Sequence, residues 1–85
     1  MTLKLRAGVF LVDTDYGIAI LDENSGQYFD LNPSGALILR TLLDGGTYEQ
    51  AAQQLSTEYV VDPATASQDV TALLEEFRSA GLALP

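Results

Sequence analysis

Short apolar runs and turn-forming clusters alternate through the first quarter of the chain. Residues 7–12 and 17–22 are rich in Val, Ile, Leu and Phe, and the segment between them, residues 13–17, contains two Asp and a Gly. Apolar runs separated by such a cluster predict two strands joined as a hairpin. The second run shows little polar alternation, so we expect it to be the central strand of a sheet.

A third strand is predicted at Gln27–Leu31, after a second turn rich in Asp, Asn, Ser and Gly. Its side chains alternate, with Tyr28 and Asp30 on one face and Phe29 and Leu31 on the other. Since Leu31 stands just before a helix, we place Phe29 and Leu31 in the core. Tyr28 and Asp30 are then expected to point outward or to line an edge of the sheet.

The spacing of the apolar positions becomes helical after Asn32-Pro33. An Asn side chain can accept hydrogen bonds from the free N–H groups of a first helical turn, and Pro at the first helical position loses no bond. The helix is expected to run to about Leu43, with an apolar stripe made of Ile38, Leu39, Leu42 and Leu43. Gly45-Gly46 then provides a left-handed exit.

A second helix follows at once. Thr47 and Gln50 have the spacing of a capping box, in which each side chain satisfies a backbone N–H of the other residue. We expect this helix to end near Tyr59. Its buried positions are predicted to be Ala51, Ala52 and Leu55.

Asp62-Pro63 predicts the start of a third helix by the same capping chemistry. Gly81 is expected to end it, and Leu82–Leu84 to add a short terminal extension. The apolar stripe of this helix, at helical spacing, consists of Ala66, Val70, Leu73, Leu74 and Phe77.

The order of these elements predicts an α+β fold. It is a three-stranded antiparallel sheet followed by three helices, in the manner of a winged helix-turn-helix. An 85-residue chain has room for one core, and no linker, internal repeat or low-complexity tract is visible. We therefore expect residues 1–85 to form a single domain.

The charge distinguishes this chain from DNA-binding proteins of similar outline. The net charge is −8, from 12 acidic and four basic residues, and no Lys or Arg occurs between Thr41 and Phe77. The acidic residues in that interval are Asp44, Glu49, Glu58, Asp62, Asp69, Glu75 and Glu76. Such a surface repels nucleic-acid phosphates and anionic lipids, so we expect neither nucleic acid nor a membrane as a partner. The acidity serves either solubility or the selection of a partner.

The apolar runs are too short to span a bilayer, and no secretory signal is visible. These features predict a cytoplasmic protein.

Residue types needed for catalysis or metal binding are missing. The chain has no Cys and no His, so its serines lack the usual general base, and the commonest metal ligands are absent. Glu75 and Glu76 are neighbours on a helix and point about 100° apart, while Asp13 and Asp15 lack the spacing of a calcium loop. We expect a binding module without catalytic activity, metal or cofactor.

The third strand is the candidate binding surface. As the last strand of a small sheet it has an edge to which an extended peptide can add, and the third helix would form the other wall of a cleft. The alternative is that this edge is merely polar and that Val70, Leu73 and Phe77 all belong to the core. The apolar stripe of the third helix is wide, however, so one side of it can face a groove.

Segments distributed over nearly the whole chain resemble the PqqD-type family. They are Gln-Tyr-Phe-Asp-Leu-Asn-Pro-Ser-Gly-Ala at residues 27–36, Leu-Leu-Asp-Gly-Gly-Thr at residues 42–47, Asp69-Val70 with Leu74, and Gly81-Leu82. No single motif is specific, and their order and spacing carry the resemblance. The first two segments are more similar to the stand-alone leader-recognition proteins of lasso-peptide biosynthesis than to proteins of the pyrroloquinoline quinone pathway.

The resemblance implies a RiPP recognition element. Proteins of this kind are not enzymes, and they hold the leader segment of a ribosomally made precursor peptide as an added antiparallel strand between strand three and helix three. The implied partners are this precursor, a separate cysteine-protease leader peptidase and the lasso cyclase. The strand positions carried over to this sequence are Gln27, Tyr28, Phe29, Asp30 and Leu31. The helix positions are Asp69, Val70, Leu73, Leu74, Glu76 and Phe77.

Two other classes of function fit parts of the pattern. A DNA-binding winged-helix regulator needs positive charge on its third helix, where Arg78 stands alone among several carboxylates. An acyl or peptidyl carrier resembles the chain in size and acidity. Carriers attach their arm at a Ser that follows Asp at a helix start, whereas Ser34 follows Pro33 and no Asp-Ser pair occurs.

Overall fold

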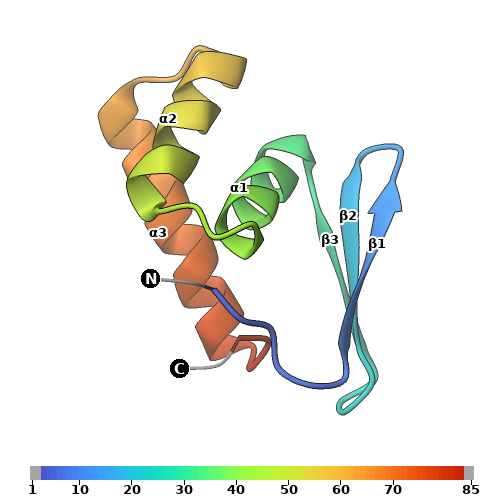
Figure 1. The fold of residues 1–85 in the computed structure, drawn as a ribbon. Helices are drawn as coiled ribbons and strands as arrows, with labels where there is room; N and C mark the ends of the chain where they lie inside the picture. The colour runs from blue at the N-terminus through green and yellow to red at the C-terminus, as the bar shows by residue number, and fades with distance from the viewer. Residues whose placement is uncertain (1–2, 84–85) are drawn as a thin grey trace.

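The sheet precedes the helices along the chain, as the sequence predicts. The structure is a computed structural model and describes residues 3–83. In order, its elements are β1 (Val9–Thr14), β2 (Gly17–Asp22), β3 (Gln27–Leu31), α1 (Pro33–Leu43), α2 (Tyr48–Tyr59) and α3 (Pro63–Ser79) (Figure 1). The predicted α+β class and the order of the elements are confirmed.

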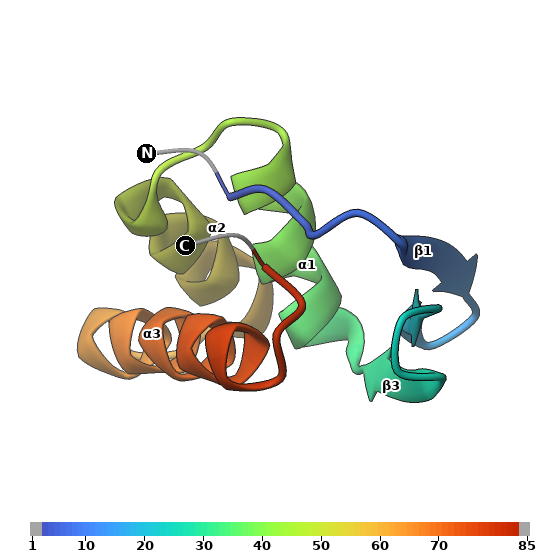
Figure 2. The ribbon, with the colours of Figure 1, turned by 90° about the horizontal axis from the view of Figure 1, so that it is seen from below.

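The three strands form an antiparallel sheet in the order β1-β2-β3, which confirms the central position of β2. Ile20 at its middle lies opposite Leu11 of β1 and Phe29 of β3. The sheet lies to one side of the three helices, and α1 packs against β2 and β3 (Figures 1 and 2).

The bounds of β1 differ from the prediction. The strand begins at Val9 and continues to Thr14, so the hairpin turn is shorter than residues 13–17. Asp13 and Thr14 pair with Ile18 and Gly17 because the turn reverses the chain tightly. Gly17 also permits a separate close approach, between the start of β2 and the end of β3, since a Cβ there would collide with the carbonyl oxygen of Leu31.

The second turn, between β2 and β3, is organised by Asp22. Its side chain is buried, and its carboxylate accepts hydrogen bonds from the Asn24 amide at 3.0 Å and the Ser25 hydroxyl at 2.9 Å. These donors, the Ser25 hydroxyl foremost, lower the pKa of Asp22 below its ordinary value of 3.8. The turn therefore holds an ionised carboxylate at neutral pH.

The predicted helix caps are present. The Asn32 side chain accepts from the Gly35 amide at 2.8 Å, and Asp62 accepts from the Ala64 amide at 3.2 Å. The capping box of α2 is reciprocal, with Thr47 Oγ1 and the Gln50 side chain each accepting from the backbone N–H of the other residue.

The end of α2 has a feature that the sequence pattern does not predict. Val60 forms the cap with a left-handed backbone, at φ +50°, and its side chain is 92% exposed. A β-branched residue is uncommon in this conformation. The exits of α1 and α3 are conventional, because Gly45 and Gly81 have positive φ.

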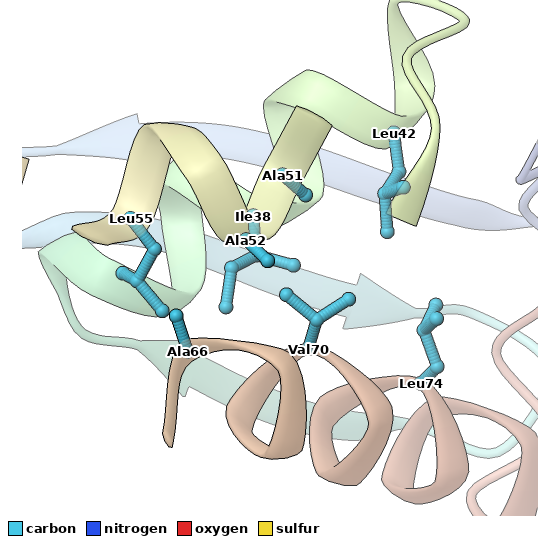
Figure 3. Close-up of a cluster of buried hydrophobic side chains, with 8 residues drawn as sticks. All are labelled: Ile38, Leu42, Ala51, Ala52, Leu55, Ala66, Val70 and Leu74. Atoms are coloured by element: carbon cyan, nitrogen blue, oxygen red, sulfur yellow. The ribbon is translucent and has the colours of Figure 1, made fainter. Parts of the chain in front are cut away.

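The apolar side chains form two clusters. One lies between the helices and consists of Ile38, Leu42, Ala51, Ala52, Leu55, Ala66, Val70 and Leu74 (Figure 3). The other lies between the sheet and the helices and consists of Ile18, Ile20, Ala36, Leu39, Phe77, Leu82 and Ala83. Leu43, Phe29 and Leu31, which the sequence placed in the core, pack against the second cluster while staying partly exposed.

The two ends of the described chain meet. Leu5 and Ala83 form an antiparallel bridge, and the Arg6 amide donates to the Leu82 carbonyl at 2.8 Å. The expected extension after Gly81 is present at Leu82 and Ala83, and Leu84 lies outside the described residues. Within residues 3–83, no helix has both the length and the apolar character needed to cross a membrane.

Candidate functional site

The edge of β3 is the first component of the candidate site. Among residues 3–83, β3 pairs with β2 alone, so its other long edge faces away from the sheet. Phe29 and Leu31 lie opposite Ile20 and Ile18, on the face turned toward the helices. The backbone groups along such an edge can accept another strand.

Tyr28 and Asp30 occupy the outward positions of β3, as predicted, and both are exposed. The Tyr28 hydroxyl donates to an Asp30 carboxylate oxygen at 2.9 Å. This bond and the negative charge of Asp30 raise the pKa of Tyr28 above its ordinary value of 10.0. Tyr28 therefore stays neutral in the physiological range.

A hollow lies between β3 and α3, which flank α1 in the view of Figure 2. This β3–α3 hollow has a volume of about 500 Å³. It is lined by Gln27, Phe29, Asp30, Leu31, Glu76, Phe77, Ser79, Ala80 and Leu82. Apolar side chains from the strand, the helix and the C-terminal segment are combined with the carboxylate of Glu76, a composition that suits an extended peptide with apolar anchors.

A second hollow adjoins the first. This α1–α3 hollow has a volume of about 280 Å³ and is lined by Asn32, Ser34, Gly35, Ile38, Leu55, Asp69, Ala72, Leu73 and Glu76. Glu76 lines both hollows, so they lie next to each other along α3, and we call the two hollows together the groove.

Helix α3 presents two different stripes of residues. The residues Ala66, Val70, Leu74 and Phe77 are buried in the two clusters. Asp69, Leu73, Glu76 and Ala80 follow one another at spacings of four, three and four residues and line the groove. The wide apolar pattern of the third helix thus divides between core and groove, and Leu73 packs at the border of both clusters.

The structure brings most of the predicted site residues together. Gln27, Phe29, Asp30, Leu31, Glu76 and Phe77 line the β3–α3 hollow, and Asp69 and Leu73 line the α1–α3 hollow. Tyr28 lies on the outer face of the sheet. Val70 and Leu74 are 1% and 3% exposed in the helical cluster and line neither hollow.

Several lining residues are not predicted by the sequence pattern. Ser79 and Ala80 stand three and four positions after Glu76, so helical spacing alone places them beside it. Leu82 returns to the groove because Gly81, with φ +73°, turns the chain back over α3. Asn32, Ser34 and their neighbours line the α1–α3 hollow because of the way α1 packs against α3, and no local sequence pattern indicates that packing.

The electrostatic character of α3 is acidic. Asp69, Glu75 and Glu76 are all exposed. Arg78 at its end donates to the Tyr48 hydroxyl at 3.1 Å. Residues 3–83 contain no group of three or more His, Cys, Asp or Glu side chains placed to hold a metal ion. The groove can therefore offer backbone hydrogen bonds, apolar contacts and negative charge to a ligand.

Known proteins share both the sequence pattern and the fold. The family model for coenzyme PQQ synthesis protein D (PqqD) matches residues 17–83. A solved structure of a lasso peptide synthetase B1, complexed with the leader peptide, matches with a TM-score of 0.93 and 40% identity over 100% of both chains. TbiB1, solved in complex with the TbiA(beta) leader peptide, matches with a TM-score of 0.84 and 26% identity, over 94% of this chain and 93% of the other. No curated protein matches significantly.

The family model covers most of the chain; β2, β3 and the three helices lie within the matched region, and β1 lies before it. The fold agrees with that of a lasso peptide synthetase B1 over its whole length. The protein therefore belongs to the PqqD family and has the fold of a RiPP recognition element.

Proposed function

We propose that this protein binds the leader segment of a ribosomally synthesised precursor peptide in lasso-peptide biosynthesis. The leader adds to β3 as a fourth, antiparallel strand and rests in the groove along α3. The observation that carries the proposal is the position of the free β3 edge beside the β3–α3 hollow. It is supported by two proteins of similar fold that were solved with leader peptides.

The β3 edge would supply affinity that does not depend on the leader sequence. Main-chain hydrogen bonds form with any extended peptide, and alternate side chains of the added strand then point toward the helices. Phe29, Leu31 and Phe77 would contact those side chains from the β3–α3 hollow. Backbone pairing with two or three buried anchors is compatible with micromolar to nanomolar affinity, or about 8–12 kcal/mol.

The proposed role is that of an adaptor. The protein itself performs no catalysis, uses no cofactor or metal, and presents the bound precursor to a separate cysteine-protease leader peptidase and to the lasso cyclase. It acts in the cytoplasm, where ribosomally made precursors are produced. The lack of His and Cys in the sequence supports a role without nucleophilic chemistry.

Titration of a fluorescently labelled leader against two matched variants tests the site. Leu73→Glu removes an apolar contact and adds a third carboxylate beside Asp69 and Glu76, so we expect leader affinity to fall at least tenfold, about 1.4 kcal/mol. Leu37→Glu is the control, because Leu37 is also partly buried on a helix but lines a different hollow, beside the hairpin turn. Equal leader affinities for a folded Leu73→Glu variant and the wild type would show that this wall of the groove does not take part in leader binding.

A second experiment tests strand addition directly. N-methylation of single leader amides removes one backbone donor at a time, and in an added strand only alternate amides point toward β3. We expect affinity losses at every second position. Losses of similar size at all positions, or at none, would contradict binding as a strand.

A further inference from the structure

A short segment before β1, residues 5–8, connects the end of α3 with the sheet. Leu5 pairs with Ala83 in an antiparallel bridge, and the Arg6 amide donates to the Leu82 carbonyl oxygen at 2.8 Å. We call residues 5–8 the N-terminal strap. In Figure 1 it is part of the blue segment that crosses from the end of α3 to the foot of the sheet.

The other end of the N-terminal strap is held by the turn between β2 and β3. The Asn24 side-chain amide donates to the Ala7 carbonyl oxygen at 2.8 Å, and the Glu23 backbone N–H donates to the Gly8 carbonyl oxygen at 2.9 Å. Gly8 has a φ of +88°, and a Cβ there would meet the Asn24 amide nitrogen at 2.8 Å. Glycine at this position therefore allows the strap to lie directly against Asn24.

The N-terminal strap acts at the end of β3 that is remote from α1. At Leu31, β3 runs directly into α1, which packs against β2 and β3. Gln27 lies four residues earlier, roughly 13 Å away along an extended strand. There the strap connects the turn before β3 with Leu82 after α3. Because Gln27 and Leu82 both line the β3–α3 hollow, the strap links the two walls of that hollow.

We propose that Asn24 is a positioning residue for the groove, because it fixes the N-terminal strap and thereby the spacing between the Gln27 end of β3 and α3. The consequence for leader binding rests on the proposed function. Asn24 is exposed and is not among the described residues that line either hollow. It therefore acts through the strap and not by contact with the leader.

Strand addition makes leader affinity sensitive to this spacing. A leader strand paired with β3 lies about 4.8 Å from it, at a position that the backbone hydrogen bonds fix. Its inward side chains then reach Phe77 and Ala80 of α3 only if the helix stays at a matching distance. A groove that already has this spacing before the leader arrives loses less conformational freedom on binding, which raises the affinity.

The spacing can be measured without a leader. The chain has no Cys, so the parent variant Tyr28→Cys/Glu75→Cys offers two unique sites for spin labels, one on β3 and one on α3, and both positions are exposed. Asn24→Ala in this parent removes the side-chain donor to Ala7 and keeps the backbone bonds of the turn. We expect pulsed electron paramagnetic resonance to give a broader label-to-label distance distribution for Asn24→Ala than for the parent.

Thr47→Ala is the matched control, because it removes the cap of α2 and leaves the N-terminal strap and its partners intact. Its distance distribution should equal that of the parent. In the unlabelled protein without added Cys, Asn24→Ala should lower leader affinity roughly threefold, as expected for the loss of one hydrogen bond. Thr47→Ala should leave leader affinity unchanged. Titration of the labelled leader measures both.

Three results would overturn this inference. Equal distance distributions for Asn24→Ala and its parent would show that the bond to the strap does not set the spacing. A broader distribution with unchanged leader affinity would show that the spacing does not affect binding. An equal loss of affinity in Thr47→Ala would trace the effect to stability. A wild-type protein that fails to bind leader would instead overturn the proposed function, while the distance measurement would still report on the strap.

Discussion

The two halves of α3 have different surroundings. On the side of its N-terminal half that faces α1 and α2, Ala66 and Val70 pack in a cluster of buried side chains (Figure 3). Its C-terminal half lies across the β3–α3 hollow from a strand whose inward residues, Phe29 and Leu31, are only partly buried. The helical half of the protein completes its own core, and the junction of β3 with α3 does not.

This difference shows how an 85-residue chain can combine a closed core with an open binding groove. Small domains bury a limited share of their surface, so each buried side chain matters. Here the helices and the central strand β2 form the closed part of the core. The groove can then remain open at the border of the two clusters. Half-buried residues such as Leu73 lose little burial free energy there when no ligand is bound.

The largest expected effect on the free energy of unfolding comes from the cluster between the helices. Leu42→Ala should lower the free energy of unfolding by about 2–5 kcal/mol, because Leu42 is 1% exposed and its removal leaves a cavity. Leu73→Ala, at the groove, should cost about 1 kcal/mol, since part of its surface already faces water. Urea denaturation of both variants measures the contrast. Equal losses would mean that the junction is packed as tightly as the helical core.

Removing the cap at the start of α1 should have an intermediate effect. Asn32→Ala eliminates the bond to the Gly35 amide and should cost about 1 kcal/mol of stability. Asn32 also lines the α1–α3 hollow, so leader affinity should fall as well. Thr47→Ala removes the corresponding cap of α2, which lies outside both hollows, and should lower stability by a similar amount with leader affinity unchanged. A loss of affinity in both variants would link binding to global stability.

The turn that leads into β3 should respond to pH. The pKa of Asp22 is lower in the folded protein than its ordinary 3.8, so its ionised form stabilises the fold above that value. This contribution is lost as pH falls through the folded-state pKa. We expect Asp22→Asn to be less stable than the wild type at neutral pH and the difference to shrink toward roughly pH 2, as measured by urea denaturation. A stability difference that stays constant across this range would show that the negative charge of the carboxylate does not contribute.

The smallest effect is expected at the ion pair between α1 and β1. Arg40 and Asp13 approach to 2.6 Å, and their side chains are 50% and 81% exposed. Exposed pairs of this kind contribute about 0–1 kcal/mol, so Arg40→Gln should change stability by less than about 1 kcal/mol. Thermal unfolding at low and high salt measures it. A larger, salt-sensitive loss would mean that this pair holds the sheet against the helices.

Local chemistry accounts for the features that the sequence predicts correctly. The caps at Asn32, Thr47 and Asp62 and the glycine exits are decided by neighbouring residues, and the structure confirms them. The predicted end of β1 is wrong because Asp13 and Thr14 still pair with Ile18 and Gly17 of β2, although their polar side chains indicate a turn in the sequence. The left-handed backbone of Val60 is not predicted because no residue type there signals it.

The sequence predicts the candidate site only in outline. Alternation along β3 separates Tyr28 and Asp30 from Phe29 and Leu31 without any knowledge of packing. Helical periodicity does not separate the groove stripe of α3 from its core stripe. Asp69, Leu73 and Glu76 each directly precede a core residue, so both stripes repeat with the same helical spacing. Leu82 and Asn32 reach the groove from segments that the chain brings together only on folding.

By itself, the sequence determined the strands, the helices, their caps and the acidic surface, since these depend on residues a few positions apart. Only the tertiary structure decided which side of α3 is buried, how far β3 stays exposed, and which face of the sheet the helices cover. Those properties depend on how the sheet and α3 pack against α1, and packing between distant segments leaves no periodic signal in the chain.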